Sequence, residues 1–355
     1  MSILVFLLIL TILVLVHEFG HFIAAKKQGI LVEEFGLGYP PRIFSIKVKD
    51  TIYSLNLIPL GGFVKVYGED YSEKISPKLK KRSFSGKKPF QKMLVLIGGV
   101  LGNFILAWVL ISYLFTQGVP APTNKIIVEN VNKNSPAQQK GIKPGDVIKK
   151  LIIDKKIYRL RQSNDLIEIT KKNAAKPITV VIERNSKEVF ITVVPRKKPP
   201  AGQGPLGIVI TSFVEKKYPW YQAPFFGLVE AINITKNIVA ELIRILFKVF
   251  TGQKVSVEVS GPIGIAYYTG KVIKFGKNAL LELISLLSLN LAIINLLPFP
   301  ALDGGRLVFV FYEAITKKRP NQNFERYLNL IGFIILIALA MVVSYNDIKK
   351  FIFLK

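Results

Sequence analysis

The stretch VHEFGH, residues 16–21, places two histidines and a glutamate inside one of the most apolar segments of the chain. On a helix, residues four apart project from the same face, so His17 and His21 can direct nitrogen atoms at one metal ion. Glu18 lies beside that face, where it can reach a water molecule on the metal without being a ligand. The motif therefore predicts zinc-dependent hydrolysis.

Two further properties favour a metal at this motif. The whole chain contains only two histidines, and both belong to it. An ionisable residue inside a membrane helix costs about 3 kcal/mol on insertion scales, so Glu18 needs a compensating partner, and a metal supplies one. The alternative is that the two histidines and the glutamate only form hydrogen bonds with neighbouring helices.

The third ligand is expected to be a carboxylate, because a catalytic zinc usually has three protein ligands and the chain has no cysteine and no third histidine. The best candidate is Asp303 in NLLPFPALDGGR, residues 295–306. At about 1.5 Å per residue, His17 lies roughly 24 Å into its helix, near the far membrane edge. The apolar segment before Asp303 crosses in the same direction and reaches the same edge. An ordinary turn is the alternative interpretation of LDGG.

The irregular sequence around Asp303 also fits a site at membrane depth. Pro298 and Pro300 break the preceding helix, and the two glycines after Asp303 let the backbone come close to a metal. Such backbone is tolerated in a membrane where it lines a cavity within the protein.

Composition indicates a membrane protein. Of 355 residues, 50% are hydrophobic, and the net charge is +26. Mean hydropathy is +0.37. The basic residues are scattered along loops without any signature of nucleic-acid binding, so anionic membrane lipid is the expected partner and nucleic acid is not. The absence of cysteine excludes disulfides.

Four apolar segments are long enough to span a bilayer, at about residues 2–25, 93–115, 280–297 and 328–345. Lysines and arginines concentrate between the first two segments, at residues 26–27, 78–82 and 87–88. By the positive-inside rule this connection is cytoplasmic. Residues 117–278 are then extracytoplasmic, and both chain termini are outside.

The connections carry structure of their own. Residues 31–70 show strand-like alternation around a turn at Lys49 and Asp50, which predicts a β-hairpin beside the membrane or, alternatively, an ordinary cytoplasmic hairpin. Residues 125–210 predict a compact α/β module with a hairpin turn at Asn185 and Ser186. An amphipathic helix at 225–250 could lie in the membrane interface or pack on that module.

These motifs together resemble the site-2 protease family of intramembrane zinc metalloproteases, in the bacterial RseP type. The resemblance follows the chain in order over nearly its whole length. It rests on HEFGH, GGFVKV at 61–66, GNFILA at 102–107, a PDZ-like module with SPAQQKGIKPGD, GPIGIA at 261–266, and NLLPFPALDGGR.

The resemblance implies an enzyme with Zn²⁺ as cofactor that cuts transmembrane segments of membrane-anchored proteins. It implies His17, His21 and Asp303 as metal ligands and Glu18 as catalytic base. It further implies that Asn295 contacts the substrate and that the hairpin, including residues 62–64 (Gly62, Phe63 and Val64), pairs with the substrate as an added strand.

The expected substrates are single-span proteins such as anti-sigma factors already trimmed by a site-1-type protease, or remnant signal peptides. The expected location is the bacterial inner membrane, with the PDZ-like domain extracytoplasmic and the active site near the cytoplasmic side.

The sequence departs from the family pattern at two places. Many relatives carry two PDZ domains, whereas this chain has room for one. GGVLGN, residues 98–103, stands where the family often has Gly-Pro before the asparagine, which we expect to affect only local helix packing.

The expected fold is a polytopic α-helical membrane protein with four transmembrane helices, a membrane-associated β-hairpin and one PDZ-like α/β domain. The expected segments are a first span (1–30), the hairpin (31–70), a cytoplasmic segment with the second span (71–118), the PDZ-like domain (119–212), an amphipathic segment (213–278), and the third and fourth spans (279–355). Two rival functions remain at this point, a non-proteolytic membrane scaffold with a PDZ-like module and a metal transporter.

Overall fold

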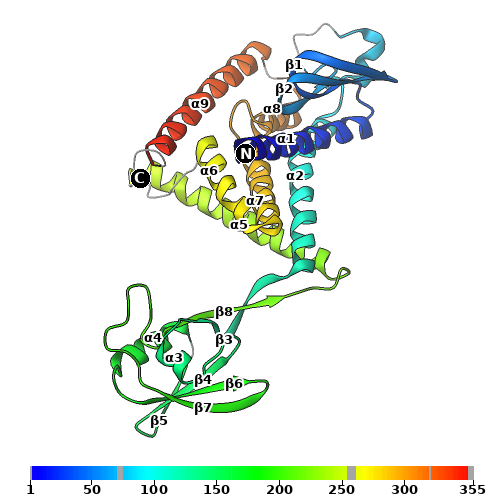
Figure 1. Ribbon diagram of the computed structural model, residues 1–355. Coiled ribbons are helices and arrows are strands. Elements are labelled where there is room, and N and C mark those ends of the chain that lie inside the picture. Colours follow the sequence, from blue (N-terminus) through cyan, green and yellow to red (C-terminus); the bar gives the residue numbers. More distant parts are fainter. Residues whose placement is uncertain (1, 70–74, 161, 254–260, 320, 351–355) are drawn as a thin grey trace. The chain divides into compact units, whose positions relative to one another are not determined.

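The computed structural model describes residues 2–69, 75–160, 162–253, 261–319 and 321–350, and it divides the chain into two compact units (Figure 1). Unit 1 comprises Met1–Thr116 and Pro219–Lys355, and unit 2 comprises Gln117–Tyr218. Parts of two predicted segments, at 70–74 and 254–260, lie outside the described residues.

Unit 1 is mainly helical. Its helices are α1 (Ser2–Lys27), α2 (Pro89–Gln117), α5 (Ala223–Phe250), α6 (Pro262–Val272), α7 (Lys277–Leu296), α8 (Asp303–Thr316) and α9 (Gln322–Ile348), with short 3₁₀ turns η1 (Pro77–Arg82) and η2 (Ile273–Phe275). Among the described residues, α1, α2, α7 and α9 are long and apolar enough to cross a membrane. The four predicted spans are thereby confirmed.

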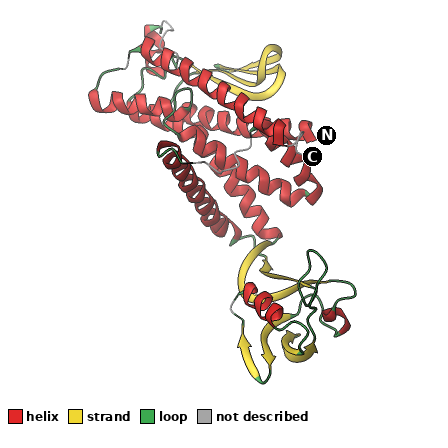
Figure 2. Ribbon diagram, turned by 90° about the vertical axis from the view of Figure 1, so that its left-hand side faces the viewer, coloured by secondary structure: helices red, strands yellow, loops and turns green. Residues whose placement is uncertain are grey.

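Two long strands, β1 (Val32–Val48) and β2 (Thr51–Val66), form the predicted hairpin, with its turn at Lys49 and Asp50. Both strands fold back on themselves, so that Phe35 in the first half of β1 pairs with Tyr53 on one side and with Val64 on the other. The result is one small sheet beside the helices rather than a simple two-stranded ribbon (Figure 2).

The last part of β2 forms an edge of this sheet next to α1. Within the part of the chain that the structure describes, residues 62–65 pair with residues 34–37 on one side only. On the other side, Thr11 of α1 donates a hydrogen bond to the carbonyl of Pro59 at 2.9 Å. The hairpin edge therefore follows the helix that carries HEFGH.

The first two helices cross at small residues. An added Cβ at Gly20 of α1 would lie 2.1 Å from the carbonyl oxygen of Gly98 of α2, so only glycine permits this approach. A buried cluster then joins α1, the hairpin, α2 and α8. Its members are Ala25, Ile30, Val32, Val66, Phe84, Val95, Leu96, Leu307 and Val310.

Helix α5 packs within unit 1, which neither sequence-based alternative anticipated. Its Ala231 is fully buried against Ala107 and Ile111 of α2 and Leu289 of α7. The indole N–H of Trp108 donates to the carbonyl of Pro224 at 2.8 Å, beside the start of α5. The amphipathic helix is confirmed, and its apolar side is directed at two of the long apolar helices.

Unit 2 is an α/β module around a sheet of order β7-β6-β4-β3-β8, with β5 paired to β4. Its elements are β3 (Val119–Val131), α3 (Pro136–Gln139), β4 (Val147–Ile153), β5 (Lys156–Arg159), α4 (Ser163–Lys172), β6 (Ile178–Arg184), β7 (Lys187–Val193) and β8 (Ile208–Lys216).

Local sequence signals in unit 2 are well reproduced. The side chain of Ser135 caps α3 by accepting from the N–H of Gln138 at 3.1 Å. Asn185 and Ser186 both have positive φ, at 51° and 62°, as the tight hairpin turn between β6 and β7 requires. The α/β module expected here is therefore present.

Candidate metal centre

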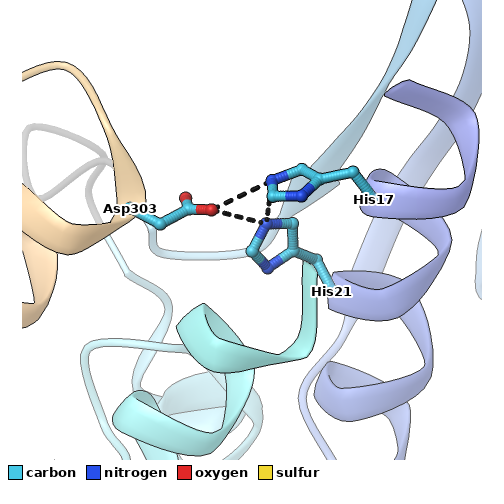
Figure 3. Close-up of side chains that lie close together, drawn as sticks. All are labelled: His17, His21 and Asp303. Carbon is cyan, nitrogen blue, oxygen red and sulfur yellow. Dashed lines mark hydrogen bonds and ion pairs between the residues drawn. The ribbon is translucent and has the colours of Figure 1, made fainter. Parts of the chain in front are cut away.

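Three ligand-type atoms converge between α1 and the start of α8 (Figure 3). The Nε2 atom of His17 lies 3.0 Å from the Oδ2 atom of Asp303, and the Nε2 atom of His21 lies 3.2 Å from the same oxygen. The two imidazole Nε2 atoms are 3.1 Å apart. Tetrahedral ligands at about 2.0 Å from a zinc ion lie about 3.3 Å from one another, so this set fits zinc in size and in chemistry.

The backbone of α2 closes one side of this cluster. An added Cβ at Gly99 would lie 2.4 Å from the Nε2 atom of His21 and 2.6 Å from the Cε1 atom of His17. Any larger residue would therefore occupy the space between the two imidazoles. GGVLGN was expected to affect only helix packing, but its second glycine also faces the candidate ligands.

The chain between α7 and α8 brings Asp303 to the histidines. Helix α7 ends at Leu296, and Ala301 takes a left-handed φ of 70° before α8 begins at Asp303. An added Cβ at Gly304 would lie 2.1 Å from the carbonyl oxygen of Leu297, so this glycine lets the segment fold over itself. The glycines after Asp303 thus serve the fold of the loop.

The ionisation of Asp303 suits a ligand. Burial alone would raise the pKa of its carboxyl group, but hydrogen bonds from His17 and His21 outweigh burial and hold the pKa below its usual range. The carboxylate is therefore in the deprotonated form that a metal requires.

Two ion pairs fix α8 against its surroundings. Lys92 of α2 is fully buried, and its Nζ atom lies 2.7 Å from the Oε2 atom of Glu313. At the other end of α8, Arg306 pairs with Glu69, three residues beyond the end of β2. The charge of Glu69 raises the pKa of the Arg306 guanidinium. Helix α8 is thus tied both to α2 and to the hairpin.

Glu18 is directed at the edge of the hairpin. The backbone N–H of Val64 donates to its Oε2 atom at 3.1 Å. Because successive N–H groups of a strand alternate in direction, the N–H of Gly62 lies on the same side as that of Val64. Gly62 is buried, and the ring of Phe63 stacks on Tyr39 with centroids 6.3 Å apart. The structure thus brings Glu18 to Val64, whereas Phe63 packs within the sheet.

Two asparagines lie beside His17. The Nδ2 atom of Asn295, at the end of α7, is 3.5 Å from the Nε2 atom of His17. The Nδ2 atom of Asn103 of α2 is 3.5 Å from the Nδ1 atom of His17. The sequence motifs assigned a role to Asn295 but none to Asn103, although GNFILA and GGVLGN both contain it and an asparagine inside an apolar span is itself a signal.

A family model describing "Peptidase family M50" matches residues 5–339. The chain belongs to peptidase family M50. The regulator of sigma-W protease RasP of Bacillus subtilis is 30% identical over 426 aligned positions, covering 98% of each chain. The zinc metalloprotease RasP of Geobacillus kaustophilus is 31% identical, over 99% of this chain and 98% of that one. A Clostridium perfringens protein provisionally named as a zinc metalloprotease is 35% identical, over 96% and 97%.

Membership in family M50 confirms the site-2 protease resemblance. The protein is an intramembrane zinc metalloprotease, and zinc is its cofactor. With four apolar helices it is an integral membrane protein. The scaffold and transporter interpretations are set aside.

Proposed function

We propose that His17, His21 and Asp303 hold the catalytic zinc of this M50 protease and that Glu18 is its general base. The observation that carries this proposal is the convergence of the three ligand atoms, with separations of 3.0, 3.1 and 3.2 Å. The bare backbone at Gly99 beside them leaves space for an ion.

A zinc ion held by these residues would lower the pKa of its water to about 7 and would polarise the scissile carbonyl. Glu18 accepts the proton that the attacking water loses and delivers it to the leaving amine when the C–N bond breaks. The N–H of Val64 holds the Glu18 carboxylate through a hydrogen bond of 3.1 Å. This bond fixes where the carboxylate points.

The substrates we propose are single-span membrane proteins cut within their transmembrane segments. A helical segment hides its backbone in hydrogen bonds and must unwind before hydrolysis. An unwound segment can pair with the edge of β2 at residues 62–64, because that edge lies beside Glu18. Asn295, within reach of His17, is suited to contact the scissile peptide.

Anti-sigma factors are a specific substrate class to test, since the name of RasP in Bacillus subtilis assigns it to sigma-W regulation. Prior trimming by a site-1-type protease and cleavage of remnant signal peptides belong to the same proposal.

The proposed location is the bacterial inner membrane, with the metal centre near the cytoplasmic side. Support comes from the basic residues between α1 and α2, including η1, whose sequence is PKLKKR. Unit 2 would then be extracytoplasmic.

Unit 2 is proposed to act as a PDZ-like domain. Its strand β8 is at the end of the sheet order, and Ser212 of β8 shares a hydrogen bond of 2.7 Å with Ser163 of α4. An edge strand beside a helix is suited to take a peptide tail by strand addition. Exclusion of bulky extracytoplasmic domains by size is an equally supported role.

Zinc analysis of an Asp303→Ala variant tests the ligand assignment. The purified variant should lose most of its zinc, because only two protein ligands remain. Asp50→Ala is the matched control, since Asp50 pairs with Arg82 at the hairpin turn and lies in no ligand cluster among the described residues. Full zinc content in Asp303→Ala would overturn the assignment.

A further inference from the structure

Asn103 is a buried polar residue in the middle of α2 that the proposed chemistry does not use. Its side chain has no solvent exposure. The Nδ2 atom lies 3.5 Å from the Nδ1 atom of His17. Within the part of the chain that the structure describes, the Oδ1 atom of Asn103 is buried with no hydrogen-bond partner. A buried amide oxygen without a partner costs about 1–3 kcal/mol.

The protonation of the His17 ring determines whether Asn103 must donate or accept a hydrogen bond. Its Nε2 atom is the one that converges with Asp303 and His21. A neutral imidazole that offers the Nε2 lone pair carries its hydrogen on Nδ1. An Nδ1–H facing the NH₂ group of an amide sets two donors against each other.

Turning the Asn103 amide by half a turn would place an acceptor next to the Nδ1–H of His17 and would give Oδ1 a donor. The oxygen and nitrogen of an amide are nearly indistinguishable in shape, and their assignment follows from the hydrogen-bond network. After the turn, Oδ1 takes the position next to Nδ1 of His17 and gains a donor. The oxygen is then no longer unsatisfied.

We propose that the Oδ1 atom of Asn103 accepts a hydrogen bond from the Nδ1–H of His17 and thereby holds the tautomer that presents Nε2 to zinc. Asn103 is thus a positioning residue for the metal ligand. This inference rests on the proposed metal role of His17.

His21 also has a hydrogen-bond acceptor for its Nδ1 atom on α2. The Nδ1 atom of His21 lies 2.8 Å from the backbone carbonyl oxygen of Val95, which can only accept. Val95, Gly99 and Asn103 are four residues apart in sequence, so they lie on one face of α2. That face supplies an acceptor for each imidazole and the bare backbone between them.

Asn103 is itself held in place from the other side. The hydroxyl of Ser288 on α7, also fully buried, donates to the backbone carbonyl of Asn103 at 2.8 Å. The same helix carries Asn295 at its end. Helix α7 therefore contacts the backbone of α2 at Asn103.

Zinc affinity of three variants, measured on purified full-length protein by competition with a chelator, tests the inference. Asn103→Leu keeps the branched shape but removes the acceptor, so zinc should bind roughly 10- to 100-fold more weakly, as when other outer partners of metal-bound histidines are lost. Asn103→Asp keeps an oxygen toward Nδ1–H, so it should retain at least wild-type affinity. His17→Ala is the reference for loss of the ligand itself.

The outcomes separate the inference from the ligand assignment. Wild-type zinc affinity in Asn103→Leu, with His17→Ala depleted of zinc, would overturn the role of Asn103 alone. Undiminished zinc in His17→Ala would instead overturn the ligand assignment. Thermal unfolding of the metal-free proteins monitors folding. The Asn103→Asp variant tests the inference even if Asn103→Leu does not fold. Loss of zinc from folded Asn103→Asp would contradict a hydrogen bond accepted at Oδ1.

Discussion

At the scale of single residues, the candidate metal centre depends on the histidines of α1 and equally on the missing side chain at Gly99 of α2. His17 and His21 supply nitrogen atoms, and Gly99 leaves open the space between their rings. Asn103 and the carbonyl of Val95 lie against the opposite nitrogens. The two histidines and the groups that orient them thus come from two helices that cross closely at Gly20 and Gly98.

Gly99→Ala should weaken zinc binding by about 10-fold or more, the scale on which disturbed ligand orientation acts. The reason is steric, because the new Cβ would lie 2.4 Å from the Nε2 atom of His21. Zinc content of the purified protein is the measurement. Gly204→Ala is the control, since a Cβ there meets nothing within 4 Å. Equal zinc in both variants would refute the close approach of α2.

The sequence predicted a set of three ligands that the structure brings together, but it did not predict the surroundings of these residues. Both histidines of the chain fall in one motif, and the lack of cysteine directs the search to a carboxylate, which is how Asp303 was named. Gly99 and Asn103 could not be found in the same way. Their importance depends on which face of α2 meets α1, and apolar periodicity is weak in a helix that is apolar on all sides.

At the scale of elements, α8 links the metal centre to the hairpin. The buried pair of Lys92 and Glu313 fixes α8 on α2, and the pair of Arg306 and Glu69 reaches to the end of β2. A buried pair of this kind is costly to break because the remaining charge is left without its partner. Asp303 and the hairpin edge are therefore positioned together.

The hairpin turn was predictable from local alternation, whereas the folding back of both strands was not. A residue such as Phe35 pairs with Tyr53 and with Val64, and such pairings between distant residues leave no local pattern. Helix α5 is a similar case, since its amphipathic pattern indicated an apolar face but not that α2 and α7 would cover it.

Val64→Pro should slow cleavage more than Val64→Ala, because only proline lacks the N–H that binds Glu18. A hydrogen bond to a charged group contributes about 1.5–3 kcal/mol, so the difference should be roughly 10- to 100-fold in rate. Cleavage of a single-span substrate in detergent provides the rates, and unchanged zinc content serves as a control. Equal rates for the two folded variants would count against a role for this N–H.

At the scale of the whole molecule, unit 2 can be removed with little disturbance at its ends. Val119 at the start of β3 pairs with Lys216 at the end of β8, so the chain enters and leaves the unit at adjacent points. A short Gly-Ser connection between residues 118 and 217 can therefore replace the unit without stretching the rest of the chain. This design allows the two proposed roles of the unit to be compared.

If unit 2 is a size filter, the deletion variant should cut intact substrates with large extracytoplasmic domains that the full-length protein leaves uncut. If it captures tails, the variant should cut trimmed substrates more slowly. Rates for both substrate forms in liposomes make the comparison. Unchanged rates for both forms, in correctly inserted protein, would eliminate both roles.

The proposed mechanism requires a zinc site built from α1 and α8 that acts with Glu18 as its base. The most direct test is Glu18→Gln, assayed in parallel for bound zinc and for cleavage of a single-span substrate. The amide can still accept the N–H of Val64 but cannot take a proton from water, so zinc should remain at the wild-type level while cleavage falls by about 100-fold or more. Cleavage near the wild-type rate by the zinc-loaded variant would contradict the account.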